Sequence, residues 1–155
     1  MSIRNWKHFS PTSLRHALEG CKDYAREIKN LSVERIADQM GVVDHWTLYK
    51  WIQTGRIPAN MIRPFEATCG IDFITRWLAA NNGKLLIDIP TGRTPCGEDM
   101  VALQRTATEA VSKLLDFYAG RCDASETLAA IKTGMSGLAW HHKNVEKHLQ
   151  PELEL

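Results

Sequence analysis

Residues 32–56, SVERIADQMGVVDHWTLYKWIQTGR, contain two short apolar patterns of helical period separated by Gly41. The first pattern has apolar residues at i, i+3, i+4 and i+7, namely Val33, Ile36, Ala37 and Met40. The second pattern consists of Leu48, Trp51 and Ile52. This spacing predicts two short helices joined by a turn.

The residues around these patterns have the chemistry of helix ends. Ser32 and Asp44 precede the two patterns, where their side-chain oxygens can accept hydrogen bonds from the first turn of a helix. Gly41 can adopt the left-handed conformation that ends a helix, and Ala37 is small enough for two helices to cross closely. The combination is typical of a helix-turn-helix, whose second helix lies in the major groove of DNA. An ordinary pair of core helices is the alternative.

The outward side of the second helix would carry the contacts with DNA. The candidate DNA-binding residues are His45, Trp46, Thr47, Tyr49, Lys50, Gln53 and Arg56. Gln53 can form two hydrogen bonds with an adenine edge, and Lys50 can reach guanine or a phosphate. The others include candidate backbone contacts, Thr47, Tyr49 and Arg56, which position a protein without reading sequence. Whether Trp46 and Tyr49 face DNA, a partner protein or the core stays open.

Length and charge fit a binding domain with an appendage. The 155 residues suit one domain or a small domain with an extension. The net charge is +1, but residues 1–63 have a balance of +4 and residues 64–155 a balance of −3. The basic half contains the predicted DNA-binding helix, and an acidic half follows it. This order favours an N-terminal DNA-binding domain followed by a C-terminal oligomerisation domain.

Several functional classes find no support in the sequence. The four cysteines, at positions 21, 69, 96 and 122, lack zinc-ligand spacing, so neither a metal site nor a cofactor is expected. No nucleophile motif, phosphate loop or spaced carboxylate pair occurs, and we do not expect an enzyme. The N-terminus lacks a signal peptide, and no apolar run reaches the roughly 18 residues of a membrane span. A cytoplasmic protein without a membrane partner is expected.

Further helices are predicted on both sides of the helix-turn-helix. Ser10-Pro11 is a helix start, and an apolar stripe continues to Lys29. After Gly55, Pro58 and Pro64 predict separate short helical turns, because proline fits a helix start better than its interior. Asp72 is the expected N-cap of one more helix. These elements make an N-terminal domain of about five helices over residues 1–90.

The segment KLLIDIP, residues 84–90, is predicted as a short strand or as an extended segment that covers the core. TGRTPCG, residues 91–97, is the expected linker between two domains.

Residues 98–155 predict an antiparallel helical hairpin. One helix extends from about Glu98 to Ala119 and the other from about Ser125 to Leu149, with Asp123-x-x-Glu126 as a capping box. Both carry apolar residues at alternating steps of three and four, as in helices that pack side by side. Because a two-helix hairpin buries little surface, we expect a dimer or tetramer. The candidate oligomerisation residues are Leu128, Ile131, Met135, Leu138, His142 and Val145.

The order of these parts resembles the CII-like regulatory proteins of bacteriophages and prophages. The resemblance is carried by LSVERIADQMG…TLYKWI, by FEATCGID, by WLAANNGKLLIDIP and by the C-terminal hairpin. It implies an oligomeric DNA-binding transcriptional regulator acting at phage promoters in a bacterial cell.

The expected fold is therefore all-α, and the expected partners are double-stranded DNA, further copies of the chain and RNA polymerase. The alternative function is a protein–protein interaction module that docks an antirepressor or a toxin–antitoxin type of partner.

Overall fold

The computed structural model describes residues 5–6, 9–90 and 95–149, apart from the side chain of His148, and these ranges contain helices and no strand. The all-α prediction is confirmed. The chain divides into two compact units, residues 1–86 and 87–155. Residues 87–90 thus belong to the second unit, and residues 91–94 of the expected linker lie outside the described ranges. Each unit is described separately below.

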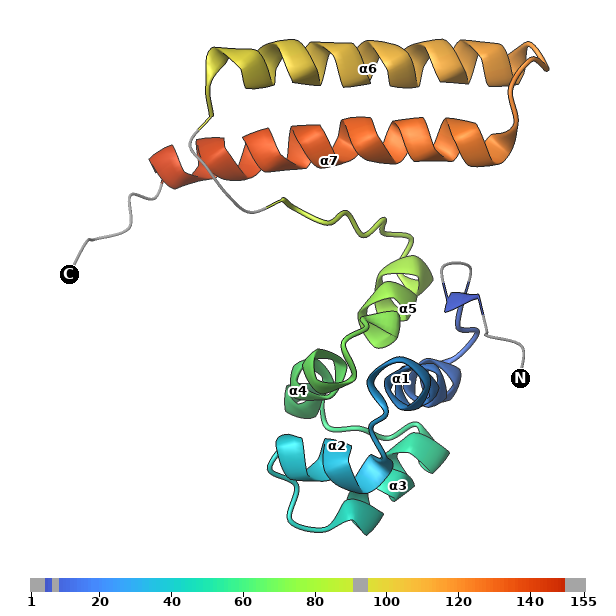
Figure 1. Cartoon of the computed structure of the whole chain (residues 1–155), viewed down its shortest axis with the longest axis vertical. Helices are drawn as coiled ribbons and strands as arrows, with labels where there is room; N and C mark the ends of the chain where they lie inside the picture. The colour runs from blue at the N-terminus through green and yellow to red at the C-terminus, as the bar shows by residue number, and fades with distance from the viewer. Residues whose placement is uncertain (1–4, 7–8, 91–94, 150–155) are drawn as a thin grey trace. The chain divides into compact units, whose positions relative to one another are not determined.

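The first unit contains five helices (Figure 1). These are α1 (Leu14–Lys29), α2 (Val33–Gln39), α3 (His45–Thr54), α4 (Ala59–Cys69) and α5 (Phe73–Asn81). The central helix is α1, which packs against α3, α4 and α5. The fully buried large side chains of this unit are Leu18, Cys21, Ile36, Leu48, Phe65, Cys69, Phe73 and Ile74. All five helices therefore share one apolar core.

The first helix begins later than predicted. Ser13, and not Ser10, is the N-cap of α1, and its hydroxyl accepts a hydrogen bond from the N–H of His16 at 3.1 Å. The preceding segment is held against the core instead: the ring of Phe9 packs on that of Phe73 with centroids 4.6 Å apart. Aromatic packing of this segment displaces the helix start by one turn.

Pro64 lies inside α4 and does not begin a new helix, so the predicted division of this segment is wrong. A proline in a helix interior removes one hydrogen bond and crowds the preceding turn. Here the helix is held by tertiary packing, because Phe65, Glu66 and Cys69 are buried directly after the proline. Burial of this face outweighs the local preference of proline.

The first turn of α5 is capped by a residue of α4 and not by the predicted Asp72. Asp72 stands at the N-cap position but makes no capping hydrogen bond, and its carboxylate pairs with Arg76 at 2.7 Å. The buried carboxylate of Glu66 on α4 accepts from the N–H of Thr75 at 2.8 Å and from its hydroxyl at 2.6 Å. Glu66 thus satisfies a free N–H group of the first turn of α5 and joins α4 to α5.

This arrangement predicts unequal effects of two carboxylate deletions. Glu66→Ala should lower the free energy of unfolding by about 1–3 kcal/mol, because it leaves the N–H of Thr75 without its acceptor. Asp72→Ala removes a partly exposed ion pair and should cost at most about 1 kcal/mol. Urea unfolding followed by tryptophan fluorescence measures both changes. Equal losses in the two variants would contradict the assignment of Glu66 as the cap.

Residues 84–90 are not a strand, which corrects that part of the prediction. A strand needs hydrogen bonds to a neighbouring strand, and none of the described residues belongs to a β-ladder. The side chains of Leu85, Leu86 and Ile89 are exposed. These three side chains therefore do not contribute to the core of a single chain, whereas Ile87 is half-buried.

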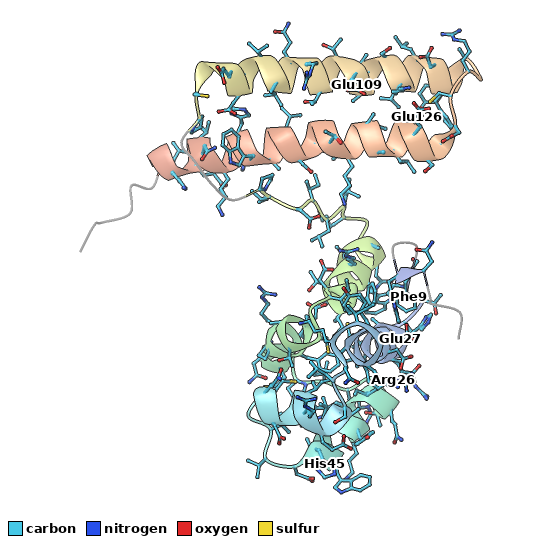
Figure 2. All side chains as sticks on the ribbon, viewed as in Figure 1. Phe9, Arg26, Glu27, His45, Glu109 and Glu126 are labelled. Atoms are coloured by element: carbon cyan, nitrogen blue, oxygen red, sulfur yellow. The ribbon has the colours of Figure 1, made fainter. Side chains whose placement is uncertain are left out.

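The second unit is a hairpin of α6 (Gly97–Tyr118) and α7 (Ala124–Leu149), which lie antiparallel (Figure 1). Asp123 accepts from the N–H of Glu126 at 2.8 Å and so supplies half of the predicted capping box. The other half is absent, because the carboxylate of Glu126 (Figure 2) pairs with Lys113 of α6 and does not return to the backbone of Asp123.

The two helices of the hairpin contact each other through small side chains on α7. A Cβ added to Gly134 would lie 3.6 Å from the Cβ of Ala110, and one added to Gly137 would lie 3.1 Å from Leu103. Thr127 is buried on the same side of α7. The apolar stripe of α7 predicted from heptad spacing is therefore turned away from α6, and only its members Ile131 and Met135 are half-buried.

Candidate nucleic-acid interface

The predicted helix pair is present as α2 and α3, joined by residues 40–44. The hydroxyl of Ser32 accepts from the N–H of Arg35 at 3.4 Å, and Asp44 accepts from the N–H of Trp46 at 3.0 Å. Gly41 has a φ of +69°, the left-handed conformation that favours glycine. Both predicted caps and the predicted turn glycine are thus confirmed.

The inward side of this helix pair is mostly covered, and only Met40 and Trp51 of the predicted apolar patterns are half-buried. Ile36 and Ala37 of α2 and Leu48 of α3 have no exposed surface, and Ile52 is buried with them. These residues were predicted to face inward from their spacing alone. Because both helices are anchored by the same core, the outward side of α3 is fixed in position.

Trp46, Lys50 and Gln53 make up the outward line of α3. They stand at i, i+4 and i+7, so they lie on one face of the helix, and all three are exposed. Trp46 is 63% exposed, so it is not a core residue. Among the residues that the structure describes, none forms a hydrogen bond or an ion pair with the side chain of Lys50 or of Gln53; Thr54 donates only to the backbone carbonyl of Lys50. The outward line is therefore free to bind a ligand.

The other candidate residues flank this line. Thr47 and His45 are half-buried at the start of α3, and Arg56 is exposed just after its end. Tyr49 is half-buried, and its hydroxyl donates to Glu34 of α2 at 3.0 Å. His45, whose place is marked in Figure 2, packs its ring against Trp46 with centroids 5.2 Å apart. The structure brings all of the candidate residues together at one helix.

The hydrogen bond between Tyr49 and Glu34 stabilises one protonation state of each group. Donation to the carboxylate raises the pKa of Tyr49 above its usual value. The pKa of Glu34 is lowered, first by its hydrogen bond with Ser32 and also by that with Tyr49. At neutral pH Glu34 is an anion and Tyr49 is neutral, so the hydrogen bond that links α2 to α3 is charge-assisted.

Two residues of this surface were not predicted from the sequence. These residues are Glu34 on α2 and Val43 in the turn before α3, and neither was among the candidate residues. Val43 is fully exposed beside the start of α3. Its apolar side chain in a turn that otherwise contains Gly41 and Asp44 was the signal that could have drawn attention to it.

The second unit exposes a further surface, here called the hairpin face. It consists of Met100, Val111, Leu115 and Tyr118 on α6 and Leu128, Leu138, Val145 and Leu149 on α7, all exposed. On each helix these residues are displaced by about a quarter turn, in the same sense, from the side that contacts the other helix. Because the helices are antiparallel, equal displacements put both stripes on the same side of the hairpin.

The hairpin face contains half of the candidate oligomerisation residues. Leu128, Leu138 and Val145 belong to it, and His142 is exposed along the same stripe, where its Nδ1 lies 3.7 Å from a carboxylate oxygen of Glu146. The α6 stripe was not predicted. Its signal was the i, i+4, i+7 spacing of Val111, Leu115 and Tyr118.

Two of the cysteines have no reactive character. Cys21 and Cys69 are buried in the first unit, and burial raises the pKa of both thiols, that of Cys69 to about 12. Both are therefore protonated at neutral pH and act as small apolar core residues. In the described ranges no group of three or more histidine, cysteine or acidic side chains is placed to hold a metal ion.

No family model matches the sequence, and comparisons with curated proteins and with solved structures find no similar protein. None of the helices in the described part of the chain is long and apolar enough to cross a membrane. Function must therefore be inferred from the surfaces of α3 and of the hairpin.

Proposed function

We propose that this chain is a sequence-specific DNA-binding regulator that inserts α3 into the major groove and binds DNA as a dimer. The observation that carries the proposal is the outward line of α3. One side of α3 is covered, and the other side presents Trp46, Lys50 and Gln53 in a row, all three exposed. In the described part of the chain, the polar ends of the Lys50 and Gln53 side chains have no hydrogen-bond or ion-pair partner. Lysine and glutamine are residues that recognise base edges.

The charges around α3 support the same proposal. Lys50 and Arg56 are exposed, and no ion pair involves either of them among the described residues. Two carboxylates of the helix pair have partners within it, since Asp44 caps α3 and Glu34 accepts from Tyr49. The cations are therefore available for phosphates, and binding should weaken steeply as salt concentration rises.

The hairpin face supports binding as a dimer. No residue of α6 is buried within the single chain, although the helix is 22 residues long. A second copy placed on the hairpin face would cover both stripes and complete a four-helix arrangement. Two copies of α3 would then read two half-sites separated by about one turn of DNA, roughly 34 Å.

The deciding experiment is selection from a library of random duplexes with the full chain at low salt, followed by gel-shift measurement of the enriched sequence. The wild-type chain should enrich one sequence. The double variant Lys50→Ala, Gln53→Ala should lose its preference for that sequence by on the order of a hundredfold, since each base-reading pair supplies about 1–3 kcal/mol of discrimination.

A matched control removes one lysine and one side-chain amide elsewhere. Lys84 and Asn81 are exposed and lie outside both α3 and the hairpin face, so replacing both with alanine should leave the preference unchanged. If the wild-type chain enriches no sequence at low salt, the DNA-binding proposal is wrong, and the exposed surface of α3 serves a protein partner instead. If it enriches a sequence and the Lys50→Ala, Gln53→Ala variant retains the preference, α3 is not the reader.

A further inference from the structure

Two apolar side chains stand exposed next to the base-reading residues. Val43, in the turn before α3, is fully exposed, and Trp46, in the first turn of α3, is 63% exposed. Neither contributes to the core that holds α2 and α3 together. Lys50 lies one helical turn further along the same face as Trp46. The apolar pair thus borders the surface that would enter the groove.

The indole of Trp46 is held in place. Its ring packs against those of His45 and Tyr49, with centroids 5.2 and 5.7 Å apart. Tyr49 is itself fixed by its hydrogen bond to Glu34, and the backbone N–H of Trp46 donates to the Asp44 carboxylate, which fixes the first turn of α3. A large apolar group that is fixed and exposed at the start of a helix is suited to meet an apolar group on a partner.

The base edges of the major groove present one apolar group, the C5 methyl of thymine. The N-terminal residues of a helix-turn-helix recognition helix are those that contact base edges. Trp46 and Val43 lie at that end of α3, whereas Gln53 lies seven residues further on. We propose that Trp46 and Val43 contact thymine methyl groups, so that the chain selects sites with thymine at fixed positions. This inference rests on the proposed function.

Stacking on an unpaired base is the other known use of an exposed tryptophan in nucleic-acid binding. The structure favours the duplex, because the indole packs against both His45 and Tyr49 and shares a face with Lys50 and Gln53, the proposed readers of paired bases. Single-stranded DNA of the same sequence is therefore included as a competitor in the test.

The test uses the duplex enriched by the wild-type full chain, remade with deoxyuridine in place of thymidine at each position in turn. Deoxyuridine retains the base pair and removes only the methyl group. We expect about a fourfold loss of affinity for each contacted thymine, the value for exposing one buried methyl group. At the position that Trp46 contacts, the Trp46→Ala variant should bind the duplex with thymine and the duplex with uracil with equal affinity.

The controls separate this inference from the proposed function. Val43→Ala, a change outside any helix, should remove the discrimination at a second thymine. Leu85→Ala removes an exposed apolar side chain that follows α5, and it should leave discrimination intact. Circular dichroism and thermal melting should be the same for the three variants and the wild type, because all three side chains are exposed.

Equal binding of the thymine and uracil duplexes by the wild-type chain would overturn the inference and leave DNA binding established. Retained discrimination at every position in both Trp46→Ala and Val43→Ala would also overturn it. Effective competition by the single strand would assign Trp46 to stacking on unpaired bases. Enrichment of no duplex at all would instead remove the proposed function on which the inference rests.

Discussion

Replacing both Leu138 and Val145 with aspartate is expected to convert the proposed dimer to a monomer. The two side chains are 55% and 61% exposed in the single chain and lie on the hairpin face. In a dimer, four apolar side chains would lose their burial, and four carboxylates would have to leave water. The dissociation constant of the dimer should rise at least about a thousandfold, which corresponds to roughly 4 kcal/mol.

Light scattering combined with size-exclusion chromatography measures this change, and a gel shift on a duplex with two half-sites should weaken in parallel. Ala129→Asp with Thr133→Asp adds the same charge to exposed positions on another side of α7 and should leave the dimer intact. If the Leu138→Asp, Val145→Asp variant dimerises as tightly as the wild type, the hairpin face is not the interface.

Replacing Phe73 with alanine is expected to lower the free energy of unfolding of the first unit by about 3–5 kcal/mol, the cost of a large cavity in a core. Phe73 is fully buried, and its ring contacts those of Trp6, Phe9 and Tyr24. Such a loss is a large part of the stability of a small domain, and thermal melting should show partial unfolding at moderate temperature.

Leu78 on the same helix provides the comparison, since it is 37% exposed and its truncation should cost clearly less. Chemical unfolding of both variants, monitored by near-ultraviolet circular dichroism, measures the two losses. A similar small loss for Phe73→Ala and Leu78→Ala would mean that the aromatic group around Phe73 does not hold the N-terminal segment to α1 and α5.

Features that depend on neighbours in sequence could be predicted. Ser32, Gly41 and Asp44 act within a few residues of themselves, and each has the predicted structural role. The inward positions Ile36 and Leu48 were likewise evident from helical spacing. Local chemistry was therefore sufficient for the ends and the covered faces of α2 and α3.

Features that depend on distant residues could not be predicted. The cap of α5 is Glu66, and nothing around Asp72 shows that another helix supplies the carboxylate. Apolar spacing identified the stripe of Leu138 and Val145 but did not reveal that Gly134 and Gly137 are the residues that face α6. Trp46 could not be assigned from spacing because its apolar ring suits both a core and a surface contact.

The Glu66 carboxylate also couples the folding of two helices. Since the acceptor for the first turn of α5 is carried by α4, a separate α5 segment has a free N–H group at Thr75 and begins without this cap. A short helix of this kind is marginal in water. Formation of α5 is thus coupled to the docking of α4, and these two helices should gain their protection from hydrogen exchange together.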